Sequence, residues 1–345
     1  MSEEARRVLI YRLGSLGDTV VSLPCLHLAA RVFPQAERRL LTNQPVNGKA
    51  APIELVLGES GLAEGTPIRY PAGSRDPMAL FRLRREIRAF DPDLLVYMTE
   101  SRGVAVAMRD IAFFRTCGIR RVIGAPVTQD LATHRYSPRK KLWEHEADRL
   151  ARCLAPLGDA TVEKRESWDL HFTAAERRHA DAALADWEGA ADFAVFSIGT
   201  KWPENDWGDA HWSKVLAALS AAAPALGLAL TGSADEAERS QALARHWRGP
   251  TLNLCGRLPP RQSALVIARA RIFLGHDSGP MHLAASVRTP AVAVFSRRNK
   301  PGIWFPYGPG HKPLYPADGA EAVEPAAVVD AAREVLARGR TDSGA

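Results

Sequence analysis

The residues best suited to ligand chemistry lie in short glycine-containing segments that each follow an apolar run. The first, Arg12-Leu-Gly-Ser-Leu-Gly-Asp18, comes directly after Val8-Leu-Ile-Tyr11. Its glycines permit a close backbone approach, and Asp18 falls near the start of the expected next helix. The carboxylate of Asp18 either faces a ligand or only caps that helix, and its position favours neither interpretation. The segment lacks the full G-x-G-x-x-G spacing, so it does not favour a dinucleotide site.

A second segment, Gly275-His-Asp-Ser-Gly-Pro-Met-His282, follows the apolar run Arg271–Leu274 and opens a helix. Free backbone N–H groups at a helix start bind anions, and the small residues Ser278 and Gly279 admit a pyrophosphate. A helix end contributes only about 0.3–1 kcal/mol to anion binding, so donors from Ser278 and His282 and a nearby cation are also needed. The alternative is an Asp-Ser-Gly helix cap with a core-facing histidine.

Two further strand ends carry polar groups. Ser197-Ile-Gly-Thr-Lys-Trp202 presents the hydroxyl of Thr200 and the ammonium of Lys201. Lys201 would neutralise a departing diphosphate, unless it is simply solvated. Thr231-Gly-Ser-Ala-Asp-Glu236 ends the next strand with acids suited to a ribose hydroxyl pair, although Glu236 is equally a favourable charge in a first helical turn.

The elements that must position these segments follow an alternating strand and helix pattern in both halves of the chain. The pattern predicts an α/β protein with two Rossmann-like domains, whose parallel sheets bind ligands at the carboxyl ends of their strands. Strands are expected at Val8–Tyr11, Arg39–Leu41, Leu94–Tyr97, Arg121–Ile123, Phe193–Ile198, Gly227–Thr231, Thr251–Leu254, Arg271–Leu274 and Ala291–Phe295. Helices are expected at Thr19–Val32, Met78–Phe90, Trp212–Ala223, Glu236–Trp247, Pro260–Ala270, Gly279–Ser286 and Glu324–Arg338.

The boundary between the domains is expected where the pattern lapses, at Asp159–Leu170. Thr173-Ala-Ala-Glu176 then forms a capping box for an alanine-rich helix that runs through Trp187. We therefore predict a first domain over 1–165, a second over 172–320, and a C-terminal helix with a polar tail over 321–345, in which Gly339 ends the helix.

Composition limits the class of protein. With 345 residues the chain exceeds one typical core, and its net charge of +6 favours an anionic partner. The four dispersed cysteines encode no disulfide scaffold or zinc ribbon, which fits a reducing cytosol. The N-terminus does not resemble a signal peptide, and no run of 18 apolar residues predicts a membrane span.

Basic residues cluster in the first half. A phosphorylated acceptor or an anionic membrane face would use such a surface, although a charge run is usually a solvated helix face. No aromatic stacking pattern or nucleic-acid motif accompanies the clusters, so no nucleic-acid partner is expected. The clusters comprise Arg82, Arg84, Arg85 and Arg88, then Arg120 and Arg121, then Arg135, Arg139, Lys140 and Lys141.

Together the segments resemble the family 9 glycosyltransferases, which include ADP-heptose:lipopolysaccharide heptosyltransferases. The N-terminal signature is matched by Arg12–Asp18 with Leu23-Pro24, and the C-terminal signature by Gly275–His282 with Leu-Ala-Ala. Gly199-Thr-Lys201, Asp206-Trp-Gly208 and Trp212 resemble the central block, so the likeness spans roughly residues 7–310. The resemblance implies a GT-B fold, with an N-terminal acceptor domain and a C-terminal nucleotide-sugar domain.

The resemblance also implies an inverting, metal-independent transfer of a heptose from an ADP-sugar to a lipopolysaccharide-core or other glycan hydroxyl, with no cofactor beyond the nucleotide sugar. Asp18 would be the catalytic base, with Arg12, Ser15 and Gly17 in the acceptor loop. Glu236 would contact the ribose. The diphosphate would be held by Thr200, Lys201, Ser278, Gly279 and His282, with Asp277 bracing their loop. A cytoplasmic enzyme that reaches a glycolipid peripherally at the inner membrane face is expected.

Two departures from the family pattern leave the donor open. Many relatives carry a lysine where this chain has Asn205, so Lys201 is expected to take over phosphate neutralisation. In the loop Ser296–Pro306 the sequence Ser-Arg-Arg-Asn-Lys-Pro stands in place of the family's usual Pro-Thr-Asp-Pro motif, which adds positive charge to this loop. The alternatives are a GT-B transferase that uses a UDP- or GDP-sugar for O-antigen, capsule or secondary-metabolite glycosylation, and a catalytically silent nucleotide-binding homologue. A dinucleotide-dependent oxidoreductase is the most distant rival.

Overall fold

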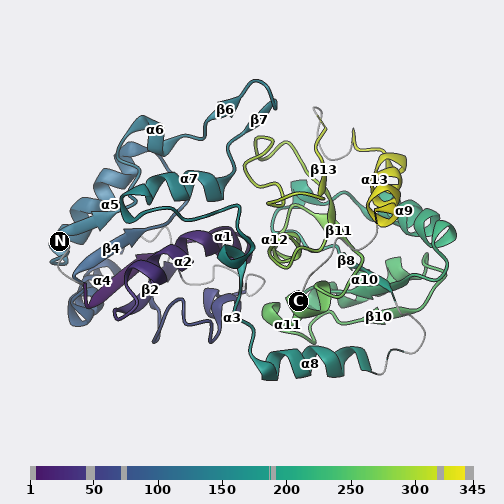
Figure 1. The fold of residues 1–345 in the computed structure, drawn as a ribbon, viewed down its shortest axis with the longest axis horizontal. Helices are drawn as coiled ribbons and strands as arrows, with labels where there is room; N and C mark the ends of the chain where they lie inside the picture. The colour runs from purple at the N-terminus through teal and green to yellow at the C-terminus, as the bar shows by residue number, and fades with distance from the viewer. Residues whose placement is uncertain are drawn as a thin grey trace. The chain divides into compact units, whose positions relative to one another are not determined.

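The chain folds into two compact units, Met1–His171 and Phe172–Ala345 (Figure 1). The structure is a computed structural model that describes residues 5–43, 51–70, 76–185, 187, 192–316 and 322–338. Gly339, expected to end the last helix, and the polar tail lie outside these residues.

Unit 1 is built on a parallel sheet in the order β3-β2-β1-β4-β5. Apart from Arg7 at the start of β1, the residues of its central strands β1 and β4 are apolar and buried, as expected for a sheet covered on both faces. Leu9 of β1 and Leu95 of β4 share a core with Leu83 and Ile87 of α4 and with Phe114 of α5. The strands are β1 (Arg7–Tyr11), β2 (Glu37–Asn43), β3 (Ile68–Tyr70), β4 (Leu94–Tyr97) and β5 (Arg121–Ile123); the helices are α1 (Leu16–Val21), α2 (Leu23–Val32), α3 (Ile53–Leu57), α4 (Pro77–Phe90), α5 (Val104–Thr116), α6 (Gln129–Ala132) and α7 (Glu146–Cys153).

Unit 2 repeats the arrangement with a parallel sheet in the order β10-β9-β8-β11-β12-β13. Phe196 of β8 and Leu274 of β11 pack in one core with Trp212 of α9, Leu243 of α10 and Val328 of α13. The strands are β8 (Phe193–Ser197), β9 (Gly227–Leu230), β10 (Thr251–Asn253), β11 (Ile272–His276), β12 (Ala291–Val294) and β13 (Lys312–Leu314); the helices are α8 (Ala174–Ala185), α9 (Asp209–Ala222), α10 (Ala237–Ala244), α11 (Pro260–Ile267), α12 (Gly279–Ser286) and α13 (Pro325–Ala337).

The predicted helix Thr19–Val32 is wrong in its start and in its continuity. The helical region begins at Leu16 and divides at Ser22 into α1 and α2. The Ser22 hydroxyl donates to the Thr19 carbonyl at 2.7 Å, and Pro24, in the first turn of α2, has no N–H to continue the ladder. A polar side chain followed by proline therefore interrupts an otherwise uniform apolar stripe.

The capping box predicted at Thr173 is confirmed. The Thr173 N–H donates to Glu176 Oε2 at 2.8 Å, and the Glu176 N–H donates to Thr173 Oγ1 at 3.2 Å. Arg261 of α11 also donates to Glu176 Oε2, at 2.9 Å, which ties α8 to α11. The helix itself ends at Ala185, short of the predicted Trp187.

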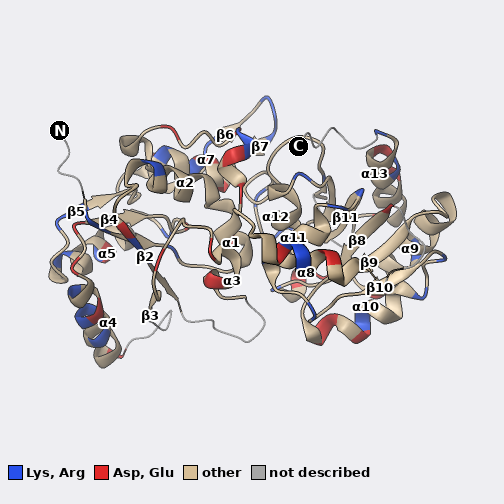
Figure 2. Cartoon of the chain, turned by 60° about the horizontal axis from the view of Figure 1, so that its bottom comes forward, with Lys and Arg blue, Asp and Glu red and all other residues tan. Residues whose placement is uncertain are grey.

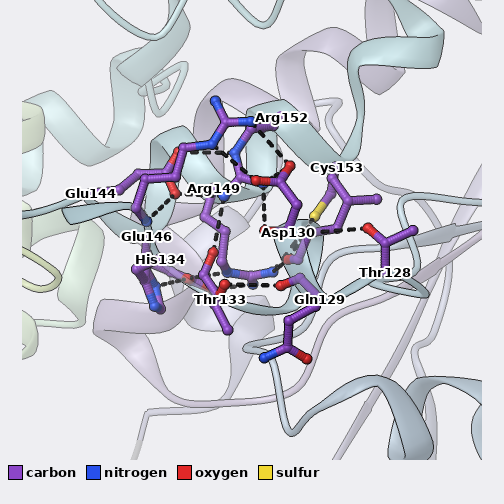
Figure 3. Close-up of polar contacts among 12 residues, drawn as sticks. Thr128, Gln129, Asp130, Thr133, His134, Glu144, Glu146, Arg149, Arg152 and Cys153 are labelled. Atoms are coloured by element: carbon purple, nitrogen blue, oxygen red, sulfur yellow. Dashed lines mark hydrogen bonds and ion pairs between the residues drawn. The ribbon is translucent and has the colours of Figure 1, made fainter.

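A short antiparallel hairpin, β6 (Tyr136–Ser137) and β7 (Leu142–Trp143), projects from unit 1 and was not predicted. A polar network fastens its base (Figure 3). Arg149 and Glu146 of α7 are both fully buried and joined by two hydrogen bonds of 2.7 and 2.6 Å. The His134 Nε2–H donates to Glu146 Oε2 at 2.8 Å, and Arg152 Nη2 donates to Glu144 Oε2 at 2.5 Å.

Candidate functional site

Asp18 occupies the third position of α1, where it both caps the helix and keeps part of its carboxylate at the surface. The Ser15 N–H and hydroxyl donate to Asp18 Oδ2 at 2.7 and 3.0 Å. Oδ1 lies 3.7 Å from Arg12 Nη2, and 18% of the side chain is exposed. The side chain remains partly exposed, so its capping role does not exclude contact with a ligand.

Arg12 and Gly14 hold Asp18 in this position. Arg12 is buried, and its guanidinium donates to the Met98 carbonyl at 2.7 Å and to the Asp18 carbonyl. Gly14 has φ +127°, and a Cβ there would collide with the Asp18 carboxyl group. Arg12 thus holds the loop from a buried position, and Gly17 is buried within α1. These residues shape the loop and hold the partly exposed carboxylate of Asp18 in place.

Glu100 is a second carboxylate of this region that sequence reasoning missed. It follows β4, the strand hydrogen-bonded beside β1, so it leaves the sheet at the same edge as Asp18. Loss of hydration raises the pKa of Glu100, and the negative charges of Asp18 and Glu146 raise it further. The buried Arg149 donates to the neighbouring Thr99 carbonyl at 3.0 Å and so fixes this turn. The sequence feature that could have identified Glu100 is an acidic residue three positions after a strand expected to be buried.

The turn between β11 and α12 is shaped as an open helix start. Ser278 is the N-cap of α12; its hydroxyl donates to the His276 carbonyl at 3.3 Å, and its oxygen accepts no hydrogen bond from the first-turn N–H groups. Ser278 and Gly279 are half-buried. Asp277 accepts a hydrogen bond from Asn299 Nδ2 at 2.9 Å, so its carboxylate faces the following loop. His282 is buried, with its ring edge-to-face against Trp304 at 6.1 Å.

The loop after β8 places Thr200 and Lys201 beside this turn along the sheet edge. The Thr200 hydroxyl closes a tight loop by donating to the Trp202 carbonyl at 3.1 Å. Lys201 is exposed, and its Nζ lies 5.3 Å from the centre of the Trp202 ring. β8 is hydrogen-bonded to β11, so the two loops leave adjacent strands.

Glu236 lies at the carboxyl ends of β8 and β9. Its Oε2 accepts the Ser233 N–H at 2.9 Å in a capping-box arrangement. Its carboxylate lies so close to Gly199 and Gly232 that a Cβ on either glycine would collide with it. The absence of a Cβ at these two glycines leaves room for the carboxylate in its observed position at the strand ends.

His276 is a structural centre of this edge that sequence reasoning missed. It is fully buried, and its Nε2 accepts the Trp207 N–H at 3.1 Å and the Trp212 Nε1–H at 3.0 Å. Its Nδ1 lies 3.2 Å from the Ile198 carbonyl, so the proton resides on Nδ1. Burial lowers the pKa of His276 to about 4, which keeps the ring neutral. The sequence feature that could have identified His276 as structural is a histidine in the pattern Gly-His-Asp with a pair of tryptophans upstream.

The structure thus brings the predicted site residues together in two sets. Arg12, Ser15 and Gly17 surround Asp18 in unit 1; Thr200, Lys201, Glu236, Asp277, Ser278, Gly279 and His282 lie at the carboxyl ends of β8, β9 and β11 in unit 2. Within the described residues, no group of three or more His, Cys, Asp or Glu side chains could hold a metal ion. No helix in the same part of the chain is long and apolar enough to cross a membrane.

Comparison with known proteins gives one consistent result. The model of the family described as Glycosyltransferase family 9 (heptosyltransferase) matches residues 80–315. Lipopolysaccharide heptosyltransferase 1 of Pseudomonas aeruginosa is 27% identical over 332 residues, which cover 88% of this chain and 81% of that protein. Lipopolysaccharide heptosyltransferase 3 of Escherichia coli K12 is 24% identical, with 84% and 82% covered.

Solved structures show the same fold. A glycosyl transferase family 9 protein from Veillonella parvula superposes with a TM-score of 0.74 at 17% identity, covering 98% of this chain and 99% of that one. E. coli heptosyltransferase WaaC, solved with ADP-2-deoxy-2-fluoro heptose, gives a TM-score of 0.65 at 20% identity, with 95% and 99% covered.

Proposed function

Because the chain belongs to glycosyltransferase family 9, we propose that it moves a heptose from ADP-heptose to a hydroxyl of a lipopolysaccharide-core acceptor. The relatives named above support the acceptor class, and the WaaC structure with an ADP-sugar analogue supports the donor. The observation that carries the proposal within this chain is the carboxylate of Asp18, which Ser15 and Arg12 hold in a partly exposed position.

In the proposed reaction Asp18 acts as the general base. Its carboxylate takes the proton of the acceptor hydroxyl as that oxygen attacks the anomeric carbon. The bond from this carbon to the diphosphate breaks on the opposite face, the electron pair leaves with ADP, and the configuration inverts. General-base assistance typically contributes about 10²–10⁴-fold in rate. The proposal includes no metal ion and no cofactor beyond the nucleotide sugar.

Unit 2 is the proposed donor side. The uncapped start of α12 at Ser278 and Gly279 offers backbone N–H groups to the diphosphate, and the helix end favours negative charge. Thr200 and Lys201 lie at the neighbouring strand end. Glu236 is the proposed ribose contact, because a carboxylate oxygen accepts hydrogen bonds from a pair of hydroxyls.

Unit 1 is the proposed acceptor side, and its β6–β7 hairpin is suited to an anionic glycolipid. Arg139, Lys140 and Lys141 are exposed at the hairpin tip, where Figure 2 shows basic residues gathered. The acids at the hairpin base are already neutralised, since Glu144 binds Arg152 and Glu146 binds Arg149. Salt-sensitive, peripheral contact with phosphate groups at the inner membrane face follows from this charge distribution. The four buried free cysteines suit a cytoplasmic enzyme.

The donor is tested by thermal-shift titration with ADP, UDP and GDP, followed by mass spectrometry of products from a panel of sugar nucleotides. Stabilisation by ADP and release of ADP from ADP-heptose support the proposal. Stabilisation by UDP or GDP alone would replace ADP-heptose with another donor. Nucleotide binding without transfer from any donor would identify a silent nucleotide-binding homologue.

A further inference from the structure

Trp202 forms the centre of a cationic cluster of which the proposed function uses only Lys201. The Arg298 guanidinium carbon lies 3.6 Å from the centre of the Trp202 ring, and Lys201 Nζ lies 5.3 Å from it. Trp202 is 40% exposed, and both cations are exposed. Among the described residues, no carboxylate or carbonyl binds the guanidinium of Arg298 or the ammonium of Lys201. Two charges are therefore gathered at one place without an internal counterion.

The backbone that carries Arg298 is fastened to the turn before α12. The Arg298 N–H donates to Ser296 Oγ at 3.2 Å, and Ser296 Oγ donates to Asn205 Oδ1. Asn205 is buried, and its Nδ2 donates to the Asp277 carbonyl at 3.4 Å. Asn299, next to Arg298, binds the Asp277 carboxylate at 2.9 Å. The loops that follow β8, β11 and β12 are thus joined into one rigid edge.

This network also explains Asn205. Its side-chain amide joins three loops from a buried position, with 2% of the residue exposed. A lysine there would place an ammonium into a site that now provides one carbonyl and one hydroxyl. Position 205 therefore serves structure in this chain, and the positive charge of the edge comes from the residues around Trp202.

We propose that Arg298 binds the diphosphate of the nucleotide-sugar donor, with Trp202 as the platform that positions it and Lys201 as the second cation. The proposal rests on the proposed function and names residues for its donor side. When a guanidinium stacks on an aromatic ring, the flat face of the guanidinium makes the cation–π contact, and its N–H groups point outward in the plane of the guanidinium. Those N–H groups remain available to bind phosphate oxygens in pairs. Trp202 thus fixes the orientation of Arg298 before the donor arrives.

The test compares ADP and AMP binding to the full-length protein by calorimetry, because the two ligands differ by one phosphate. Arg298→Gln is expected to weaken ADP binding about 10- to 100-fold, as for loss of a charge-assisted phosphate contact, and to weaken AMP binding much less. Arg297→Gln is the matched control: it removes the same charge from the adjacent exposed arginine, and it is expected to change ADP binding less than about twofold.

Trp202 is tested as a positioning residue. Trp202→Leu is expected to raise the donor KM severalfold with a smaller change in kcat, because the orientation of Arg298 is lost while its charge remains. Trp202→Phe keeps an aromatic face and is expected to restore most of the affinity. A merely structural role for Trp202 would instead lower the unfolding midpoint in both variants without separating Leu from Phe.

Three results would overturn the inference: parent-like ADP binding by Arg298→Gln, equal weakening by Arg297→Gln, or equal loss of ADP and AMP affinity. If the parent binds UDP and not ADP, the series is run with UDP and UMP; the same pattern then supports Arg298 while ADP-heptose is rejected. If the parent binds no nucleoside diphosphate, both this inference and the proposed function fail.

Discussion

Replacing His276 with leucine should destabilise unit 2 in a manner that depends on pH. The substitution leaves the Trp207 N–H and the Trp212 Nε1–H buried without their shared acceptor. Each unsatisfied buried donor costs about 1–3 kcal/mol, so His276→Leu should lower the free energy of unfolding by about 2–6 kcal/mol at pH 7. His246→Leu, at an exposed position on the surface of the same unit, is the control and should change it by less than about 0.5 kcal/mol.

The pH dependence identifies the neutral ring as the cause. Burial lowers the pKa of His276 from 6.5 to about 4, so the unfolded chain binds a proton at pH values where the folded chain does not. The parent therefore loses stability as the pH falls from about 6.5 toward 4, by about 3 kcal/mol over the whole window. The leucine variant lacks this titration. The difference in free energy of unfolding between the parent and His276→Leu should therefore shrink by about that amount as the pH falls through this window.

The assay is guanidinium unfolding followed by tryptophan fluorescence and circular dichroism at pH 7.0, 6.0 and 5.0. Burial also lowers the pKa of His311, but this residue is present in the parent and in both variants, so its contribution cancels in the comparison. Parallel stability curves for the parent and His276→Leu across this range would refute the assigned ring state. Equal destabilisation by His246→Leu would refute the assigned contacts.

Three further predictions concern unit 1. Burial raises the pKa of Glu146, but hydrogen bonds from Arg149 and His134 outweigh this effect and hold the pKa at about 2. Glu146→Gln should therefore lower the free energy of unfolding by about 3–5 kcal/mol at pH 7, because Arg149 is left buried without its ion-pair partner. An unchanged melting temperature would contradict this prediction. Gly14→Ala should displace the Asp18 carboxylate, the proposed base, and so lower kcat at least tenfold while the affinity for ADP is unchanged. Burial raises the pKa of the Cys25 thiol strongly, so native protein should leave this cysteine unalkylated by iodoacetamide at pH 8, and rapid labelling without unfolding would count against its burial.

Much of the fold could be predicted because its signals are local. The strands Leu94–Tyr97 and Arg121–Ile123 and the helix Gly279–Ser286 have the predicted bounds. Continuous apolar runs indicate buried parallel strands, and a Ser-Gly-Pro start indicates a helix. The expected GT-B fold class and the resemblance to family 9 are confirmed by the family match and by the solved heptosyltransferase structures.

The features that could not be predicted depend on contacts between residues that are far apart in the sequence. The edge strands β3 (Ile68–Tyr70) and β13 (Lys312–Leu314) are too short to give a periodic signal. The bonds of His276 to two tryptophans join positions more than 60 residues apart. Glu100 was missed because its neighbour Asp18 is distant in sequence, and only the pairing of β1 with β4 relates them. Local patterns locate elements and motifs, whereas tertiary contacts decide which polar residues are structural.

The most direct test of the proposed chemistry is single-turnover transfer from ADP-heptose to a deacylated lipopolysaccharide core, comparing the parent with Asp18→Asn. Asparagine retains an oxygen that can accept the Ser15 hydrogen bonds, so the loop and ADP affinity should be preserved while the base is removed. The account predicts a rate about 10²–10⁴-fold below that of the parent, with ADP binding unchanged. Transfer by Asp18→Asn at the parent's rate would contradict it.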